Sequence, residues 1–549
     1  MQVEICREKI DRAQLPSHAL ASAERELARL AKLTPAEAEY TIISDYIDWL
    51  TGLPWNRSSD SHISPQKARD MLREDLLGVK AARERILEHM AIWHINPELR
   101  FPTFCLTGPT GTGKRTLARA VARSLGRKFL HISTDELLEE SELRGEWRAK
   151  VGNRPGLIIR MLKECGENDP VILIEGIDRA DGESRSRLIS ALLEITHPER
   201  NHLFQDRYLN VAFDLSKAVF IATAGSPYSI PEPFRDVFEI VRLPGYTTRV
   251  KLEIASNHLA PKRLTEAGLE GVKFSMPAIR EIVENYTHEA GVHELDRRIA
   301  EVCRKLSADF GTTRRTSATI DAETIRRLLG PPVVSPEMIG RFAEVGIATA
   351  LVLTRTGATV SYVEATRMIG QGKVRITGKP PDAVEELVQM SLSYIKSHAE
   401  ELEVPAERIA ESDIHIHFPG GILEEDCASL GLAVIIQLVS LFTEMPVHSD
   451  FAFSGEISIR GKVLPVEGIE EKVFAAHRSA ISKVFLPGSC KRDISRLPEE
   501  IRSEIEFILV DDVSSAIQKG LMKIILPNKN LKQTIENLTR ESSETSESE

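Results

Sequence analysis

Residues 104–125 read FCLTGPTGTGKRTLARAVARSL. An apolar run from Phe104 to Thr107 leads into a glycine-rich loop, and a helical pattern of apolar residues follows that loop. Glycines let backbone N–H groups converge on an anion, and the start of a helix favours negative charge. The stretch therefore predicts a strand, a helix and, between them, a phosphate-binding loop with the residues Gly108, Gly111, Gly113 and Lys114. A plain glycine-rich turn is the alternative.

The sequence around this loop predicts three regions of different character. PVILIEGID at 170–178 and KAVFIATAG at 217–225 read as further buried strands between helical stretches. Such alternation predicts a parallel α/β domain over 76–245. The helical periodicity that follows predicts a helical domain over 246–332. Residues 1–75 carry apolar residues at three- and four-residue spacing, which predicts a helical segment.

Beyond Pro331-Pro332 the sequence mixes both kinds of element. DIHIHF at 413–418 alternates with period two, as strands do, and SLGLAVIIQLVSLF at 429–442 has the length and composition of a buried helix. These patterns predict an α+β domain over 333–528. The last stretch, 529–549, ends in ESSETSESE and predicts a disordered acidic tail, because it has little apolar surface to bury.

Composition narrows the class of protein. The 549 residues include 70 Lys and Arg against 81 Asp and Glu, a net charge of −11, which argues against a dedicated nucleic-acid binder. The six cysteines are scattered without the paired spacing of a zinc site or a disulfide framework. The apolar run Leu430 to Phe442 is too short to span a bilayer, and the N-terminus has no signal-peptide pattern. We therefore expect a cytoplasmic protein with no metal site and no membrane contact.

The phosphate-binding loop departs from what ATP hydrolysis needs. The residue after the lysine usually supplies a hydroxyl to Mg²⁺, but here it is Arg115, and Thr116 lies one helical step further and is expected to point elsewhere. The acidic strand end reads Glu175-Gly176, where an aspartate near the metal and a water-activating glutamate are usual. Glycine cannot polarise water, so we expect hydrolysis to be lost. ATP binding stays possible, and no cofactor is required.

A serine and a lysine in the predicted α+β domain, 333–528, are candidates for nucleophilic catalysis. Ser429 stands at the start of the apolar helix, where backbone N–H groups can hold an oxyanion, although an ordinary helix-capping serine fits the same position. Lys472 shares the apolar stripe of its helix with Ile469, Val473 and Ala476, while Glu470, Glu471 and Arg478 lie off that stripe. Burial would lower the lysine pKa and make it a general base. A snorkelling lysine is the alternative.

Two neighbouring features are weighed against this pair. His415 and His417 share one face of a predicted strand, so a Ser-His dyad is conceivable, although such pairs are more often structural. Cys427 carries no sign of activation and is interpreted as a packing residue.

From about residue 8 to 528 the chain resembles Lon proteases without the family's N-terminal substrate-recognition domain, similar to the LonC branch. The resemblance rests on RGEWRAKVGNRPG at 144–156, AFDLSKAVFIATAG at 212–225, HEAGVHELDRRI at 288–299 and GEISIRGKVLPVEGIEEKVFAAHR at 455–478. It implies a helical N-terminal segment, an AAA+-type parallel α/β domain with a helical lid, and an α+β Lon-type protease domain. Ser429 and Lys472 then match the family's catalytic residues. Ser454 replaces the threonine that hydrogen-bonds the lysine, and Asp426 is a residue that tunes the site.

The same resemblance implies a degenerate ATPase. The first sensor falls on Gly225, the arginine finger on Val237, the second sensor on His293 and the substrate-gripping aromatic residue on Lys150. An arginine finger alone contributes about 10³–10⁵ in rate. The expected protein is thus a Ser-Lys endopeptidase that cleaves unfolded polypeptides without ATP hydrolysis, in a homo-oligomeric chamber, for which the resemblance implies a hexamer. A conventional ATP-dependent Lon protease and a non-proteolytic chaperone-like ring are the rival hypotheses.

Overall fold

The computed structural model describes residues 2–59, 65–75, 77–96, 99–137, 139–179, 185–269, 271–313, 318–332, 343–354, 357–378, 381–419 and 424–522. These residues divide into two compact units, one ending at residue 332 and one beginning at residue 343, with Gly357 grouped with the first. Each unit is described by itself. The predicted tail at 529–549 lies outside the described residues.

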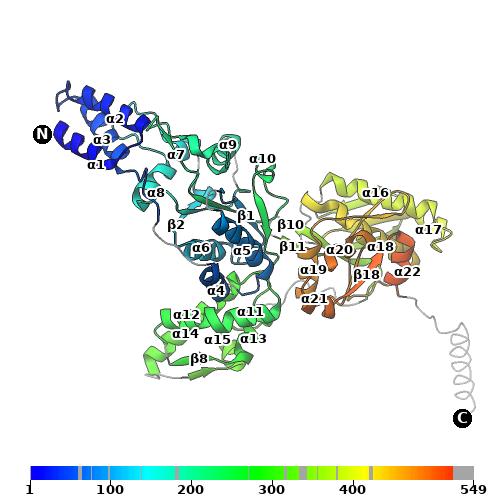
Figure 1. Ribbon diagram of the computed structural model, residues 1–549. Helices are drawn as coiled ribbons and strands as arrows, with labels where there is room; N and C mark the ends of the chain where they lie inside the picture. Colours follow the sequence, from blue (N-terminus) through cyan, green and yellow to red (C-terminus); the bar gives the residue numbers. More distant parts are fainter. Residues whose placement is uncertain are drawn as a thin grey trace, which may run out of the picture. The chain divides into compact units, whose positions relative to one another are not determined.

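The first unit begins with the predicted helical segment. Its helices are α1 (Gln2–Ala13), α2 (Ser17–Leu30), α3 (Ala38–Gly52) and α4 (Pro65–Asp75), of which α1 to α3 are drawn in dark blue in Figure 1. Leu30, Ile47 and Leu50 are fully buried. They share one hydrophobic core with residues of the α/β domain that follows. The helices therefore form part of the unit's packing.

A five-stranded parallel sheet holds the phosphate-binding loop. Its strand order is β2-β3-β6-β1-β7, with β1 (Phe104–Thr107), β2 (Phe129–Ser133), β3 (Val171–Glu175), β6 (Val219–Ala224) and β7 (Glu239–Arg242). All four pairings are parallel. The surrounding helices are α5 (Lys80–Ile95), α6 (Lys114–Leu125), α7 (Glu140–Arg144), α8 (Leu157–Cys165), α9 (Arg185–Thr196) and α10 (Glu232–Arg235). The predicted parallel α/β architecture is confirmed.

The helical domain after this sheet has a core of its own. It contains α11 (Thr248–Ile254), α12 (Ala260–Glu266), α13 (Met276–Asn285), α14 (His293–Thr313) and α15 (Ala322–Leu329). Thr247, Ser275 and Asp321 accept hydrogen bonds from backbone N–H groups at the starts of α11, α13 and α15, as N-cap residues do. A short parallel pair, β8 (Val272–Phe274) with β9 (Ala318–Ile320), was not predicted.

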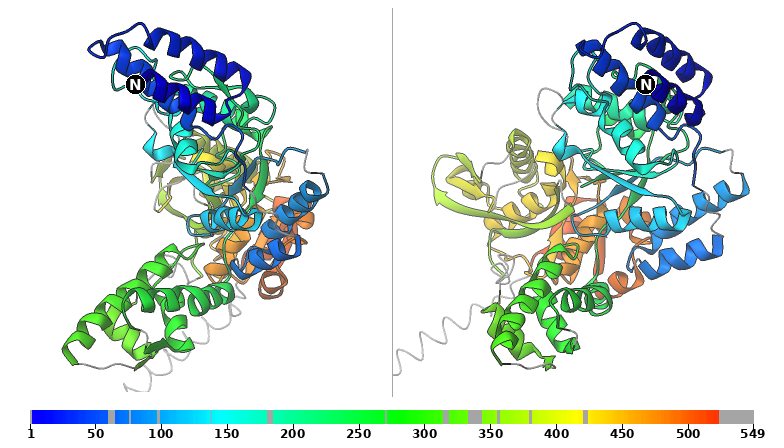
Figure 2. Two further views of the ribbon diagram at one scale, coloured as in Figure 1. Left: turned by 60° about the vertical axis from the view of Figure 1, so that its left-hand side comes forward. Right: turned by 90° about the vertical axis from the view of Figure 1, so that its left-hand side faces the viewer.

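The second unit is built on a seven-stranded mixed sheet of order β12-β13-β11-β10-β14-β17-β18. The strands are β10 (Ile347–Thr354), β11 (Gly357–Ile369), β12 (Val374–Thr377), β13 (Ser412–His417), β14 (Phe451–Phe453), β17 (Lys483–Pro487) and β18 (Glu506–Val510), and the long strand β11 is yellow-green in Figure 2. Its longer helices are α16 (Asp382–Ser397), α18 (Gly431–Thr443), α19 (Ile469–Arg478) and α22 (Val513–Gly520). The predicted α+β character is confirmed.

Helix α18 is the centre of this unit. Every residue from Gly431 to Phe442 is buried, and the stretch Asp426–Thr443 is long and apolar enough to cross a membrane by length and composition. However, 89% of that stretch is buried inside the protein, which is the condition of a core helix. Its burial fixes the segment immediately before it, where Ser429 lies.

Candidate functional site

Ser429 stands in a short 3-10 segment, Glu424–Leu430, that runs directly into α18. The segment is kinked at Asp426, whose φ of −144° and ψ of 42° are not helical. This kink places the carboxylate beside the serine three residues on, and Ser429 Oγ donates to Asp426 Oδ1 at 2.5 Å. The serine side chain is fully buried.

Lys472 reaches the same point from α19, in another part of the sequence. Its Nζ lies 2.5 Å from Ser429 Oγ and 2.5 Å from Asp426 Oδ2. The lysine is fully buried between Ile469 and Val473, so the predicted position in the apolar stripe is confirmed and the snorkelling alternative is wrong. The backbone N–H of Leu353 also donates to Asp426 Oδ2, at 3.1 Å, and anchors the carboxylate to β10.

Burial and charge act on the lysine in opposite directions. Removal from water disfavours the ammonium and lowers the pKa of Lys472 below its ordinary value of 10.5, while Asp426 favours the ammonium and opposes that shift. The lowering prevails because the side chain has no exposed surface. A buried amine whose pKa is lowered gives up its proton more readily than an exposed lysine, which is what a general base requires.

The predicted supporting residues fall in different places. Ser454 follows β14 and is fully buried, but its Oγ has no hydrogen-bond partner among the described residues, so the expected bond to Lys472 is not formed. Its backbone N–H donates to Phe485 O at 3.0 Å, and the N–H of Gly455 donates to Ser429 O at 3.1 Å. Ser454 therefore belongs to the frame of the site through its backbone.

Glu471 corrects one prediction about α19. We expected it to lie off the buried stripe, yet it is 6% exposed and its Oε2 has no partner among the described residues. Helix α19 is enclosed on more sides than a single stripe allows, because β10 and the short helices α20 (Lys491–Ile494) and α21 (Glu499–Glu504) all pack against it. This additional negative charge favours the ammonium form of Lys472, as Asp426 does.

The histidine alternative finds no support in the geometry. His415 Nε2 and His417 Nδ1 lie 2.9 and 2.8 Å from Thr377 Oγ1, on the neighbouring strand β12. The hydroxyl of Ser429 is instead engaged by Asp426 and Lys472. Cys427 is 8% exposed and packs in the core around α18, as interpreted from the sequence.

In the first unit, the predicted loop lies between β1 and α6. Gly108, Gly111 and Gly113 have φ values of 147°, 81° and 84°, which side chains rarely adopt. Lys114 Nζ is folded back onto the loop and donates to the carbonyl oxygens of Gly108 and Pro109 at 2.5 and 2.8 Å. Burial lowers the pKa of this lysine to about 8. The loop thus has the backbone form that a phosphate requires.

A cavity of about 500 Å³ opens onto this loop. Its polar wall includes Lys114, Arg115 and Glu175, and its apolar wall is formed by Leu77, Tyr246, Ile254, Leu259 and Val292. The helical domain closes one side, because Val292 N donates to Gly111 O at 3.1 Å. These residues fit the phosphates and the base of a nucleotide.

The residues that should hold Mg²⁺ do not fit that ion. Arg115 stands where a hydroxyl is needed, and its guanidinium donates to His131 Nδ1 at 3.5 Å. The other ring nitrogen, His131 Nε2, lies 2.7 Å from Glu175 Oε2, so the carboxylate at the strand end already has a partner. Thr116 borders the cavity, contrary to our expectation that it points elsewhere. A guanidinium and an imidazole crowd the position of a hard divalent cation.

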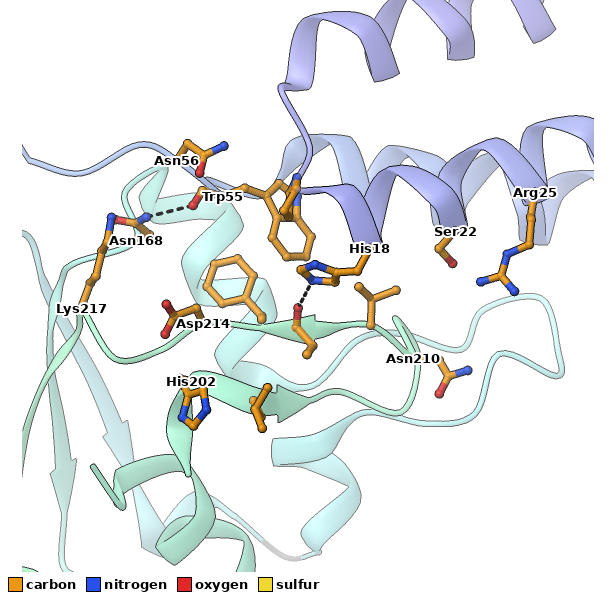
Figure 3. Close-up of a pocket in the computed structure, with 15 residues that line it drawn as sticks. His18, Ser22, Arg25, Trp55, Asn56, Asn168, His202, Asn210, Asp214 and Lys217 are labelled. Atoms are coloured by element: carbon orange, nitrogen blue, oxygen red, sulfur yellow. Dashed lines mark hydrogen bonds between the residues drawn. The ribbon is translucent and has the colours of Figure 1, made fainter. Parts of the chain in front are cut away.

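A second cavity, of about 630 Å³, lies between the N-terminal helices and the hairpin of β4 (Phe204–Gln205) and β5 (Ala212–Phe213). Trp55 packs against Phe213, and Figure 3 shows His18 directed at the hairpin backbone. The two ring centroids are 4.9 Å apart, and His18 Nε2 donates to Ala212 O at 3.0 Å. None of the predicted site residues lines this cavity.

Comparison with known families assigns the regions. Residues 104–246 match the ATPase family associated with various cellular activities, residues 265–317 the Lon protease AAA+ ATPase lid domain, and residues 319–523 the Lon protease (S16) C-terminal proteolytic domain. Ser429 and Lys472 both lie in the last of these matches.

Proteins of similar sequence are named Lon proteases, as the family matches would suggest. The chain is 40% identical over 527 residues to a Lon protease of Dictyoglomus thermophilum, covering 95% of this chain and 66% of the relative. It is 39% identical over 517 residues to Lon protease 2 of Myxococcus xanthus, covering 94% and 62%. It is 40% identical over 525 residues to a Lon protease of Syntrophus aciditrophicus, covering 95% and 66%. The chain spans less than two thirds of the length of Lon protease 2.

Proposed function

Because the chain belongs to the Lon protease family, we propose that it is a serine endopeptidase in which Ser429 and Lys472 form the catalytic dyad. The observation that carries this proposal is the 2.5 Å contact between Lys472 Nζ and Ser429 Oγ in a fully buried setting. A charged amine so deeply buried would be costly without a function, because an apolar side chain of similar volume packs as well or better.

The chemistry follows from the two side chains. Once Lys472 has lost its proton, the Ser429 hydroxyl donates to Nζ, and Oγ attacks the carbonyl carbon of the scissile peptide bond. The proton taken by Nζ then passes to the leaving amine, and the C–N bond breaks to give an acyl-enzyme. Water, deprotonated by Nζ, attacks this ester, and the proton on Nζ passes to Ser429 Oγ as the ester bond breaks and the acid product leaves. Backbone N–H groups near the start of α18 hold the oxyanion.

Asp426 controls when this reaction can start. In the arrangement described here Ser429 donates to Asp426, and the lysine donates to both neighbours. The carboxylate thus favours the ammonium form, which cannot accept the serine proton. We assign Asp426 as a positioning residue that orders the kinked segment and delays deprotonation of Lys472.

Asp426→Asn is expected to move the acidic limb of the pH–rate profile to lower pH. Removing the negative charge removes the interaction that favours the ammonium, so the pKa of Lys472 falls further. We expect the whole acidic limb to lie at lower pH than in the native protein, because a close charge partner of the ammonium has been removed. The measurement is the initial rate of peptide cleavage from pH 5 to 10, with Asp382→Asn on the exposed start of α16 as control. An unchanged limb, or one at higher pH, would contradict this role.

We further assign proteolysis without ATP hydrolysis to this chain. The support is the set of residues around the phosphate-binding loop: Gly176 has no side chain to polarise water, and Arg115 occupies the position of the metal-binding hydroxyl. Positions that serve metal binding, water activation, sensing and substrate pulling are altered together. The nucleotide cavity then contributes no force for unfolding. We propose that the chain works in the cytoplasm as a homo-oligomeric chamber, with six subunits by resemblance to the family. Such a chamber would admit loosely folded polypeptides.

The test uses one substrate in two states. A small disulfide-bonded protein is offered in its native form and after reduction and alkylation, each with and without Mg²⁺ and ATP. We expect cleavage of the unfolded form to be independent of ATP, and cleavage of the native form to be at least about tenfold slower, since native domains expose unfolded segments only rarely. Stimulation by Mg²⁺-ATP would favour a conventional ATP-dependent Lon protease instead.

A chaperone-like ring without proteolysis is the remaining rival. It would protect unfolded chains from aggregation equally well with Ser429→Ala as with the native serine. Loss of substrate degradation in that variant, measured in the same samples, separates the two activities.

A further inference from the structure

The carboxylates that line the cavity of the phosphate-binding loop are already engaged. Glu175 Oε2 lies 2.7 Å from His131 Nε2. Asp296 accepts from Arg263 Nε at 2.8 Å and from a second nitrogen of the same guanidinium. Both acidic side chains of this wall therefore have partners that a metal ion would have to displace.

Two of the basic side chains in the same wall, by contrast, have no carboxylate partner among the described residues. Lys114 donates only to the carbonyl oxygens of Gly108 and Pro109. Arg115 contacts the imidazole of His131, and across the described part of the chain neither cation has a carboxylate within salt-bridge distance. By contrast, Arg179 is held by Asp135 at 2.8 Å. The charges left unmatched at this cavity are positive.

The backbone adds to this preference. Helix α6 starts at Lys114, and α14, which is 21 residues long, starts at His293. The start of α14 abuts the loop, because a Cβ on Gly111 would lie 2.8 Å from His293 N. Helix N-termini carry partial positive charge, so two of them at one loop favour an anion and disfavour a divalent cation.

We propose that this cavity binds the diphosphate of a nucleotide without a divalent metal ion, with Arg115 in the place that Mg²⁺ takes elsewhere. Guanidinium pairs with phosphate oxygens through charge-assisted, often bidentate hydrogen bonds. Arg115 is exposed at the cavity wall and can leave its 3.5 Å contact with His131 at little cost. The apolar wall around Ile254 and Leu259 receives the base.

The experiment measures binding of ADP to the full-length protein by isothermal titration calorimetry, once in excess EDTA and once in excess Mg²⁺. Proteolysis is not the readout, so this result is independent of the proposed dyad. We expect ADP to bind in EDTA at least as tightly as in Mg²⁺. Pyrophosphate and adenosine are titrated in parallel, and binding of pyrophosphate but not of ADP would show that inorganic phosphates, rather than nucleotides, are the ligands.

Arg115→Ser restores the hydroxyl and removes the guanidinium. Its affinity for ADP in EDTA should fall by about tenfold or more, the value of one charge-assisted pair, and Mg²⁺ should then improve binding. Arg119→Ser is the matched control, because Arg119 lies one turn further along α6 and stacks over Phe129, outside the cavity lining.

Three further results would overturn the proposal. ADP binding that appears only with Mg²⁺ would show that the metal site is intact. Absence of binding under both conditions would show that the cavity is not a nucleotide site. Equal affinities of the native protein and Arg115→Ser in EDTA would remove Arg115 from the site. Thermal unfolding of each variant confirms that the fold is retained.

Discussion

Replacing Ser429 by alanine is expected to lower the rate of peptide-bond cleavage by about 10⁴-fold or more, which is the scale of losing the nucleophile of a serine protease. The fold should remain, because the hydroxyl is the only group removed from a fully buried side chain. Asp426 then loses a donor, but keeps Leu353 N and Lys472.

The measurement is degradation of an unfolded protein, followed by gel and by release of acid-soluble peptides. Ser393→Ala is the matched control, because Ser393 is exposed on α16 and donates only to the carbonyl of Gln389. Residual cleavage within tenfold of the native rate would show that another residue supplies the nucleophile.

Replacing Lys472 is expected to cause the second-largest loss of cleavage rate. Lys472→Met keeps the length and the packing of the side chain, but cannot accept a proton, and should cost about 10³-fold or more in rate. Lys472→Arg keeps the charge beside Asp426, but a guanidinium does not lose its proton in proteins, so the same loss is expected. Lys396→Met, on the exposed face of α16, is the control.

The two lysine variants differ in stability, and this difference tests the ion pair. In Lys472→Met the carboxylate of Asp426 stays buried without its cation, so thermal unfolding should occur at a lower temperature than in Lys472→Arg.

In the native protein the rate should rise with pH through the lowered pKa of Lys472, since only the neutral amine accepts the serine proton. A rate independent of pH up to the ordinary lysine range would contradict this assignment.

The sequence contains the local part of the site. The spacing of Ile469, Lys472 and Val473 places the lysine on a buried helix face, and the apolar run after Ser429 predicts a helix that fixes the serine. Both follow from periodicity within one element. The fold class follows in the same way, because strand and helix periods are properties of short windows.

Contacts between distant elements could not be predicted in this way. The kink at Asp426 depends on the N–H of Leu353 in β10. The position of His131 beside Glu175 follows from the register of β2 against β3, in which Ser133 pairs with Glu175. Glu471 was misjudged for the same reason, because a single-face pattern does not record what covers the other flank. Within the sequence 129–133, FLHIS, strand alternation indicates only that His131 and Ser133 lie on the same face of β2. It does not indicate that Glu175 of β3 lies beside them.

The proposed dyad lies at the boundary between two hydrophobic cores. Cys427 and Leu430, on either side of the serine, pack in the core around α18, whereas Ile469 and Val473 beside the lysine pack in the neighbouring core. The two reactive atoms stay in register only while both cores hold together. On heating, peptide-bond cleavage should therefore be lost before the second unit unfolds as a whole. A partly unfolded molecule of the proposed protease would then no longer degrade other proteins.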